Sequence, residues 1–309
     1  PEYKIIRKTE KDFLSLCNNV DKATNISLQP IERFNLDSAI VFSDILVIPA
    51  LLGQKVVFTE RYGPMLENLD HKLINSMNKK NVNFKSDINT YEVIKKIRGS
   101  LDKKKGLIGF CGAPWTIACY MIDGSSKQNF IKSKSWIKTN KTLLLELLDI
   151  IVEVSVDHLL YQGESGCDSL MIFDSWASLV PEDSFDDIII APTKKIISKI
   201  KKTFTTITYP KGIGHKIISF DKHVQSNVLG VDHHTDLNWL LKNISSSTVL
   251  QGNLNPHVLR EGGHKLVSET EKILEMTKER KHIFNVGHGI IKDTPVGNVY
   301  KVLDIIRRF

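Results

Sequence analysis

The chain has 309 residues, of which 41% are hydrophobic and 25% charged, the composition of a globular protein with a full core. No apolar run reaches the roughly 18 to 20 residues of a membrane span, and no signal peptide opens the sequence. The net charge is +7, but lysine is spread widely and no stretch combines dense basic residues with regular aromatics. We therefore expect neither nucleic acid nor membrane as a partner, and an anionic small ligand stays open.

The cysteines indicate a compartment. Cys17, Cys111, Cys119 and Cys167 stand singly, without a C-x-x-C pair. Isolated cysteines of this kind are typical of free thiols in a reducing environment. We expect a cytoplasmic protein.

Seven short apolar, β-branched runs end abruptly in polar residues or glycine. In chain order they span residues 38–44, 106–112, 169–174, 203–209, 228–232, 248–253 and 282–288. Near-continuous hydrophobicity over so few residues is typical of a strand buried on both faces.

Helical patterns lie between these runs, most clearly at residues 143–160, 191–202 and 295–307. Alternating strands and helices predict a parallel sheet, either open and doubly wound or closed as a barrel. The lack of a G-x-G-x-x-G or P-loop motif argues against the nucleotide-binding doubly wound alternative. We predict an α/β protein with one (β/α)8 TIM-type barrel domain over residues 1–309. Because only seven strands are counted, we expect the first strand and its N-terminal segment to be missing from this chain.

In such a barrel the active site forms at the carboxyl ends of the strands. The runs end, with neighbouring residues, at Asp44, Gly112 with Pro114 and Trp115, Asp174 with Ser175, Tyr209 with Lys211, Asp232, Asn253, and Asn285 with His288. A ring of polar groups around an apolar wall suits a small molecule.

Four candidate site residues each have a structural alternative. Asp44 could cap a helix or hold a turn. Tyr120 could be a core tyrosine with a satisfied hydroxyl, and Ser175 could be a turn hydroxyl. His288 lies between glycines, where it could bind an anion or move a proton, or be a buried structural histidine.

Metal and serine-nucleophile chemistry find little support. His233 and His234 are adjacent, but neighbouring histidines rarely share one ion, and no cysteine lies nearby. The sequence also lacks the G-x-S-x-G elbow of a serine hydrolase. We expect no metal.

Several segments together resemble the uroporphyrinogen decarboxylase family of haem biosynthesis. They are PEYK, LQPIERF, FSDIL, GLIGFCGAPWT, MIFDSW, LQGNLNP and FNVGHGI, in order along the whole chain. The resemblance implies a distorted (β/α)8 barrel, a homodimer, one deep cleft and no metal or organic cofactor. It implies removal of carbon dioxide from four acetate side chains of uroporphyrinogen III, an anionic tetrapyrrole, to give coproporphyrinogen III.

The same resemblance implies roles for six residues. Asp44 would accept the pyrrole N–H groups and stabilise the protonated ring, with its own pKa lowered by those bonds. Tyr120, Ser175 and His288 would bind substrate carboxylates, His288 being also a candidate proton donor. Arg7 and Phe110 match a binding arginine and a wall phenylalanine. Phe42 and Trp115 are further apolar wall candidates.

The chain departs from the family pattern in three places. The family carries two arginines and the first strand just upstream of PEY, and this chain begins after them. We expect those arginines in the sequence preceding Pro1, and little or no activity if the protein lacks them. LQGNLNP, where the family more often has an aspartate, and Tyr209-Pro210-Lys211 ahead of a glycine are departures expected to lie outside the chemistry.

Two other functions were weighed. Corrinoid-dependent methyltransferases share the barrel but bind zinc through a His-x-Cys pair and a distant cysteine, whereas this chain has no cysteine beyond Cys167. A non-catalytic tetrapyrrole-binding protein on a decayed barrel is the second alternative. The presence of all the strand-end residues argues against it.

Overall fold

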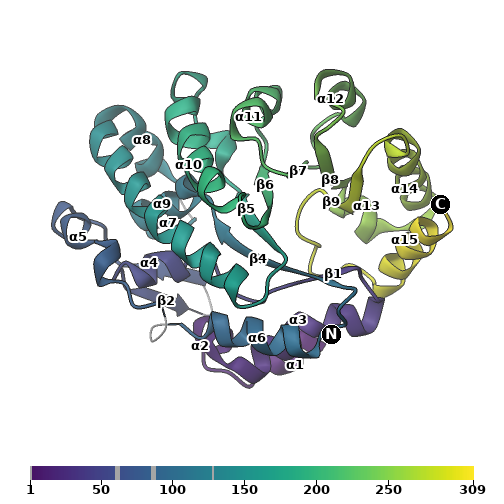
Figure 1. The fold of residues 1–309 in the computed structure, drawn as a ribbon, viewed down its shortest axis with the longest axis horizontal. Helices are drawn as coiled ribbons and strands as arrows, with labels where there is room; N and C mark the ends of the chain where they lie inside the picture. The colour runs from purple at the N-terminus through teal and green to yellow at the C-terminus, as the bar shows by residue number, and fades with distance from the viewer. Residues whose placement is uncertain (1, 60–62, 85–87, 127–128) are drawn as a thin grey trace.

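Seven parallel strands form a curled sheet whose outer side is covered by helices (Figure 1). The computed structural model describes residues 2–59, 63–84, 88–126 and 129–309. The strands follow one another in the order β1 (Ser38–Ile40), β4 (Gly106–Gly112), β5 (Ser169–Asp174), β6 (Thr205–Pro210), β7 (Val228–Gly230), β8 (Val249–Leu254) and β9 (His282–Val286). All seven predicted strands are confirmed.

The predicted burial is right for the middle of the sheet and wrong at its ends. Strands β6, β7 and β8 are buried along nearly their whole length. By contrast Ile40 of β1 is 43% exposed and Ile283 of β9 is 42% exposed. Each of these strands pairs with one neighbour only, and no strand among the described residues joins β9 to β1. The predicted additional strand stays a prediction.

Helices connect successive strands and form the outer layer. They are α1 (Glu2–Arg7), α2 (Phe13–Asn18), α3 (Val20–Phe34), α4 (Val47–Leu51), α5 (His71–Ser76), α6 (Thr90–Ser100), α7 (Pro114–Asp123), α8 (Ile131–Thr139), α9 (Lys141–Glu164), α10 (Ala191–Ile200), α11 (Lys216–Val224), α12 (Leu237–Asn243), α13 (Pro256–Glu261), α14 (Gly263–Thr277) and α15 (Val296–Arg308), with short helical turns η1 (Lys79–Asn81), η2 (Ala177–Leu179), η3 (Glu182–Ser184) and η4 (Asp186–Ile190). The three predicted helices are confirmed as α9, α10 and α15. Among the described residues, no helix is long and apolar enough to cross a membrane.

A small antiparallel hairpin stands apart from the sheet. It pairs β2 (Val56–Thr59) with β3 (Gly63–Leu66) between β1 and β4 in the chain. The hairpin was not predicted, because each of its strands has only four residues.

The helix layer continues across the gap between β1 and β9. Helix α15 packs on α3, and the Tyr300 hydroxyl donates to the Arg33 carbonyl at 3.0 Å. The Arg307 guanidinium donates to the Phe34 carbonyl at 2.9 Å, and the rings of Phe34 and Tyr300 lie 5.1 Å apart. The ring of helices therefore closes although the sheet does not.

The two faces of the sheet carry separate apolar clusters. Residues such as Leu107, Leu170 and Leu250 face the helices and belong to the main core. Alternate residues on the same strands form the inner cluster, made of Met171, Ile207, Tyr209 and Val228 with Ile108, Phe110, Phe173 and Val249 packed against it. This separation follows from the two-residue period of a strand. The inner cluster lines the interior of the curled sheet. The carboxyl ends of the strands lie at one edge of this interior.

Candidate active site at the strand ends

The predicted polar residues follow the carboxyl ends of different strands. Asp44 comes after β1, Ser175 after β5 and His288 after β9, while Tyr120 lies on α7, which begins just after β4. Because the strands are parallel, these ends meet at one edge of the curled sheet, where barrel enzymes have their active sites.

Asp44 combines a turn function with a free oxygen. Its Oδ1 accepts the Leu46 N–H at 2.7 Å, so the turn alternative is correct for one oxygen. The helix-cap alternative is wrong, since Leu46 itself is the residue before α4. The hydrogen bonds of the described residues leave Oδ2 without a partner, and the side chain is partly exposed. Burial raises the pKa of Asp44 and the Leu46 N–H lowers it.

Tyr120 lies within electrostatic reach of Asp44. Burial raises the pKa of Tyr120, the side chains of Trp176 and Ser126 lower it, and the Asp44 charge raises it again. Its ring packs edge-on against Phe130 at 5.2 Å, and the side chain is only partly buried. Tyr120 is therefore not fully buried in the core.

The N-terminal helices bring a cation toward the same place. The rings of Tyr3 on α1 and Phe13 on α2 lie 5.8 Å and 5.4 Å from the Phe42 ring, two residues before Asp44. Burial raises the pKa of Cys17, the Asp44 charge raises it and the Arg7 charge lowers it. Arg7 and Asp44 thus both act on the same buried thiol.

Aromatic rings form the inner wall beside this region. The Phe110 and Phe173 rings lie 5.6 Å apart in an edge-to-face arrangement, and Tyr209 continues the row at 6.1 Å from Phe173. Trp115, expected to be a wall residue, is 0% exposed. Its indole donates to the Trp176 carbonyl at 3.0 Å, so it supports the wall from within the core.

Asp174 is the last residue of β5, and Ser175 lies in the turn that follows it. Asp174 is fully buried toward α7, where its Oδ1 accepts the Thr116 hydroxyl at 2.7 Å. Thr116 in turn accepts the Trp176 N–H at 3.2 Å. This chain of bonds fixes the turn that presents the partly exposed Ser175.

The buried Asp174 carboxyl should make the free energy of unfolding depend on pH. Burial raises its pKa to about 7, while the Thr116 hydroxyl and the Trp176 N–H lower it. The folded state therefore binds a proton more tightly than the unfolded state, and stability is lost as pH rises from about 4 to about 7.

We expect Asp174→Asn to remove this component, which has a slope of up to about 1.4 kcal/mol per pH unit. Urea unfolding of both proteins between pH 4.5 and 8 measures it. Parallel stability profiles for the two proteins would show that Asp174 carries no such proton.

His288 sits in a tightly held turn. The Tyr209 hydroxyl donates to the Gly287 carbonyl at 2.7 Å, and Nδ1 of His233 lies 3.4 Å from the same oxygen. A Cβ on Gly287 would lie 2.4 Å from the His233 backbone nitrogen. The turn can therefore lie this close to the His233 backbone only with glycine at position 287. His288 itself is exposed, and the buried structural alternative is wrong.

Lys211 contacts His288. It was predicted only as a strand-end residue, without this contact. Its Nζ lies 3.2 Å from Nε2 of His288. Partial burial, Lys211 and His233 lower the pKa of His288, while Asp232 raises it. The strand-end position of Lys211 was the one signal in the sequence, and its contact with His288 arises from tertiary structure.

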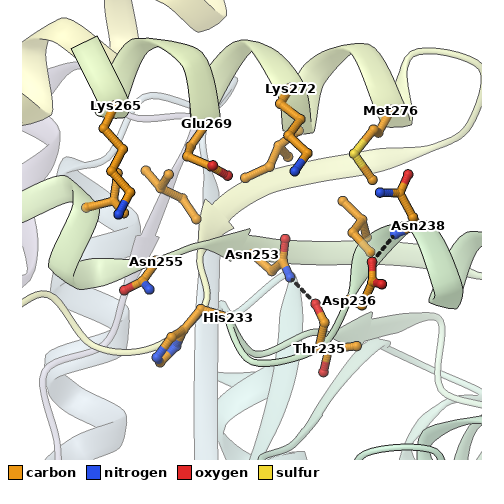
Figure 2. Close-up of a pocket in the computed structure, with 14 residues that line it drawn as sticks. His233, Thr235, Asp236, Asn238, Asn253, Asn255, Lys265, Glu269, Lys272 and Met276 are labelled. Atoms are coloured by element: carbon orange, nitrogen blue, oxygen red, sulfur yellow. Dashed lines mark hydrogen bonds between the residues drawn. The ribbon is translucent and has the colours of Figure 1, made fainter. Parts of the chain in front are cut away.

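A cavity of about 340 Å³ lies next to His233. It is bordered by α14, the end of β8 and the segment after β7 (Figure 2). Lys265 and Lys272 reach toward it from α14, and Asn253 faces them, with its amide donating to the Thr235 carbonyl at 3.0 Å. None of the six predicted site residues lines this cavity. Its lining includes His233, which follows β7, so the cavity adjoins the strand-end site at that residue.

The histidine pair does not complete a metal site. The rings of His233 and His234 lie 4.1 Å apart. Within the described part of the chain, no three His, Cys, Asp or Glu side chains lie together as ligands of one ion would.

The structure thus arranges the six predicted residues in two parts along one edge. The Asp44 charge and the Trp176 side chain both act on the pKa of Tyr120, and the Arg7 and Asp44 charges both act on the pKa of Cys17. The wall residue Phe110 lies on the inner face of β4. His288 lies with the basic residues after β6 and β7, and the hydroxyl of Tyr209 on the aromatic wall bonds to the turn that carries it.

Comparisons with known proteins place the chain in a family. The sequence model of the family described as uroporphyrinogen decarboxylase (URO-D) matches residues 1–309. A protein named uroporphyrinogen decarboxylase from Rickettsia africae (strain ESF-5) is 43% identical over 312 residues, covering 100% of this chain and 90% of that protein. Another of that name, from Rickettsia akari (strain Hartford), is 42% identical over 313 residues, covering 99% and 91%.

Solved structures show the same fold at low identity. A methyltransferase from Methanosarcina mazei superimposes with a TM-score of 0.79 at 20% identity, over 99% of this chain and 90% of that one. A B12-independent methionine synthase from Shewanella sp. W3-18-1 gives a TM-score of 0.60 at 14% identity, over 95% and 89%. These likenesses concern the fold alone, and the barrel-type prediction is confirmed. The family model matches the whole chain, and relatives of that name are more than 40% identical to it. The chain therefore belongs to the uroporphyrinogen decarboxylase family.

Proposed function

We propose that this chain is a carboxy-lyase that converts uroporphyrinogen III into coproporphyrinogen III by removing the carboxyl groups of four acetate side chains. The observation that carries the proposal is the Asp44 carboxylate at the end of β1. One oxygen is held by the Leu46 N–H at 2.7 Å, which fixes the group, and the other is available to a ligand. A fixed carboxylate beside an apolar wall suits a ligand with converging N–H donors.

The chemistry needs an electron sink. A proton added to a pyrrole carbon makes the ring cationic, and the bond to the carboxyl group then breaks as its electron pair neutralises the ring. Carbon dioxide leaves behind an exocyclic methylene group, which takes a proton while the ring carbon gives one up. Each of the four decarboxylations therefore consumes one proton and replaces CH2–COO⁻ with CH3. No metal or organic cofactor is required in this scheme.

Asp44 would stabilise the cationic ring. Its charge acts across a short distance in a site where apolar side chains limit the access of water. Burial raises the pKa of Asp44 in the free protein, whereas pyrrole N–H groups bonded to the carboxylate would lower it. Substrate binding would therefore keep Asp44 ionised at the stage where its charge is needed.

The remaining residues would bind the periphery of the substrate. Tyr120, Ser175, Arg7 and His288 offer donors to carboxylate side chains, and Phe110 borders the macrocycle. The net charge of +7 favours such an anionic ligand.

The setting of this activity is also part of the proposal. We infer one barrel domain that works as a homodimer in the cytoplasm. The four buried free cysteines support a reducing compartment, and the family resemblance supports the dimer. Light scattering should give twice the monomer mass.

Product analysis tests the proposal. The protein with its natural N-terminus is incubated anaerobically with uroporphyrinogen III, and the oxidised porphyrins are separated by chromatography. We expect porphyrins with seven, six, five and finally four carboxyl groups. Tight binding of the substrate without loss of carboxyl groups would instead support the non-catalytic binding protein.

A further inference from the structure

The basic residues after β6, β7 and β9 form a corner of the strand-end site that the proposed function has used only through His288. This basic corner consists of Lys211, His233, His234 and His288. Lys211 is anchored by its backbone N–H, which donates to the Asp174 carbonyl at 3.0 Å. Its half-buried side chain reaches His288, with 3.2 Å between Nζ and Nε2.

The contact between Lys211 and His288 joins two basic groups. An ammonium has only donors, so Nε2 of His288 must accept and the imidazole is neutral, with its proton on Nδ1. The groups that face His288 are Lys211, His233, His234 and Asp232, and partial burial and the neighbouring cations lower the pKa of His288. The corner thus holds a lysine charge beside an imidazole that is kept neutral.

The nearby carboxylate does not neutralise Lys211. Asp232 accepts the Gly212 N–H at 2.7 Å through Oδ2, and the His234 and Thr235 N–H groups at 2.8 Å and 3.2 Å through Oδ1. Its oxygens are therefore occupied in holding the loops after β6 and β7 together. Among the described residues no carboxylate forms an ion pair with Lys211.

A solvent-accessible ammonium that contacts an imidazole and has no carboxylate partner among the described residues is suited to an external anion. We propose that Lys211 is a substrate-binding residue, and that its ammonium and the His288 imidazole together hold one carboxylate side chain of the tetrapyrrole. This inference rests on the proposed function for the identity of the ligand. It revises the expectation that the Tyr209-Pro210-Lys211 departure lies outside the chemistry.

Binding changes the protonation of the pair. When a carboxylate arrives, the ammonium turns from the imidazole to the anion, and the pKa of His288 rises as the negative charge approaches. His288 then takes one proton from solvent and becomes the second donor. The site accordingly binds one carboxylate and one proton together.

The test compares Lys211→Met, which removes the charge at similar length, with Lys211→Arg, which keeps it. Lys199→Met, on the exposed face of α10, removes one charge away from the site and controls for net charge. We measure kcat and KM for uroporphyrinogen, the dissociation constant of coproporphyrin by tryptophan fluorescence, and the His288 pKa by NMR of its ring.

We expect Lys211→Met to raise KM and the coproporphyrin dissociation constant about tenfold while kcat stays within about threefold. Its His288 pKa should rise in the free protein, because the neighbouring cation is gone. Lys211→Arg should recover most of the affinity, and Lys199→Met should behave as the wild type.

The inference is overturned if Lys211→Met binds coproporphyrin as the wild type does, if Lys199→Met weakens binding equally, or if kcat alone falls. A wild-type protein that binds coproporphyrin but releases no carbon dioxide would refute the proposed function. The binding and NMR comparisons would still decide the role of Lys211.

Discussion

Replacing Asp44 with asparagine should lower kcat/KM for uroporphyrinogen on the order of 10³-fold, because the amide cannot supply the negative charge that the cationic ring requires. The amide oxygen retains the acceptor for the Leu46 N–H, a bond of 2.7 Å in the structure. Burial raises the pKa of the Asp44 carboxyl, which means that the charged form is disfavoured in the folded protein. The variant should therefore be at least as stable as the wild type.

Steady-state kinetics and urea unfolding of the same preparations separate the two effects. Asp70→Asn is a matched control, since Asp70 also accepts a backbone N–H, from Leu73 at 2.7 Å, but lies at the start of α5 away from the strand ends. It should keep wild-type activity. Near-normal turnover by Asp44→Asn in a protein that decarboxylates normally would remove Asp44 from the mechanism.

The second large effect is expected at Gly287. An alanine Cβ there would lie 2.4 Å from the backbone nitrogen of His233 and 2.8 Å from its Cα. Backbone atoms cannot yield as a flexible side chain does, so the turn must move by a substantial fraction of an ångström. We expect Gly287→Ala to destabilise the protein by about 1 to 3 kcal/mol. Because His288 moves with the turn, kcat/KM should fall roughly 10- to 100-fold.

Gly289, on the other side of His288, provides the comparison. A Cβ at Gly289 meets nothing within 4 Å, so Gly289→Ala should unfold at nearly the wild-type temperature. Calorimetry of the two variants measures the difference. Equal unfolding temperatures would show that the close approach of Gly287 to His233 does not constrain the turn.

Most of the sheet could be predicted from the sequence, because a strand buried on both faces leaves an uninterrupted apolar run. Residues 106–112 and 169–174 were predicted as strands and are β4 and β5 with the same bounds. The exposed side chains of Ile40 and Ile283 were not predicted, since a run of apolar residues does not tell whether a strand has one neighbour or two. That depends on pairing with distant segments.

The candidate site was predictable to the extent that barrel topology brings strand ends together. Asp44 and His288 lie where this reasoning places them, although 244 positions separate their numbers in the sequence. The contact of the Tyr209 hydroxyl with the Gly287 carbonyl was not predictable, since it spans 78 residues and depends on the depth to which Tyr209 projects. The pairing of Lys211 with His288 has the same origin.

Asp174 shows a further limit of prediction from the sequence. Side chains alternate along a strand, but the sequence alone does not say whether Asp174, at the end of β5, faces the helices or the interior. The hydrogen bond from Thr116 on α7 places Asp174 on the outer side. Such a partner is known only once the helix has packed.

The contact between α3 and α15 closes the helix ring with residues that lie 267 and 273 positions apart. Contacts between residues so far apart in the sequence form late in folding, because the long loop between them must close at a cost in chain entropy before they can stabilise the fold. On a ribosome adding about 5 to 20 residues per second, α3 waits on the order of tens of seconds for α15 to be made. Until then the Phe34 ring, which packs against Tyr300 in the finished fold, is open to other chains, so folding during synthesis should depend on chaperones more than refolding of the finished chain does.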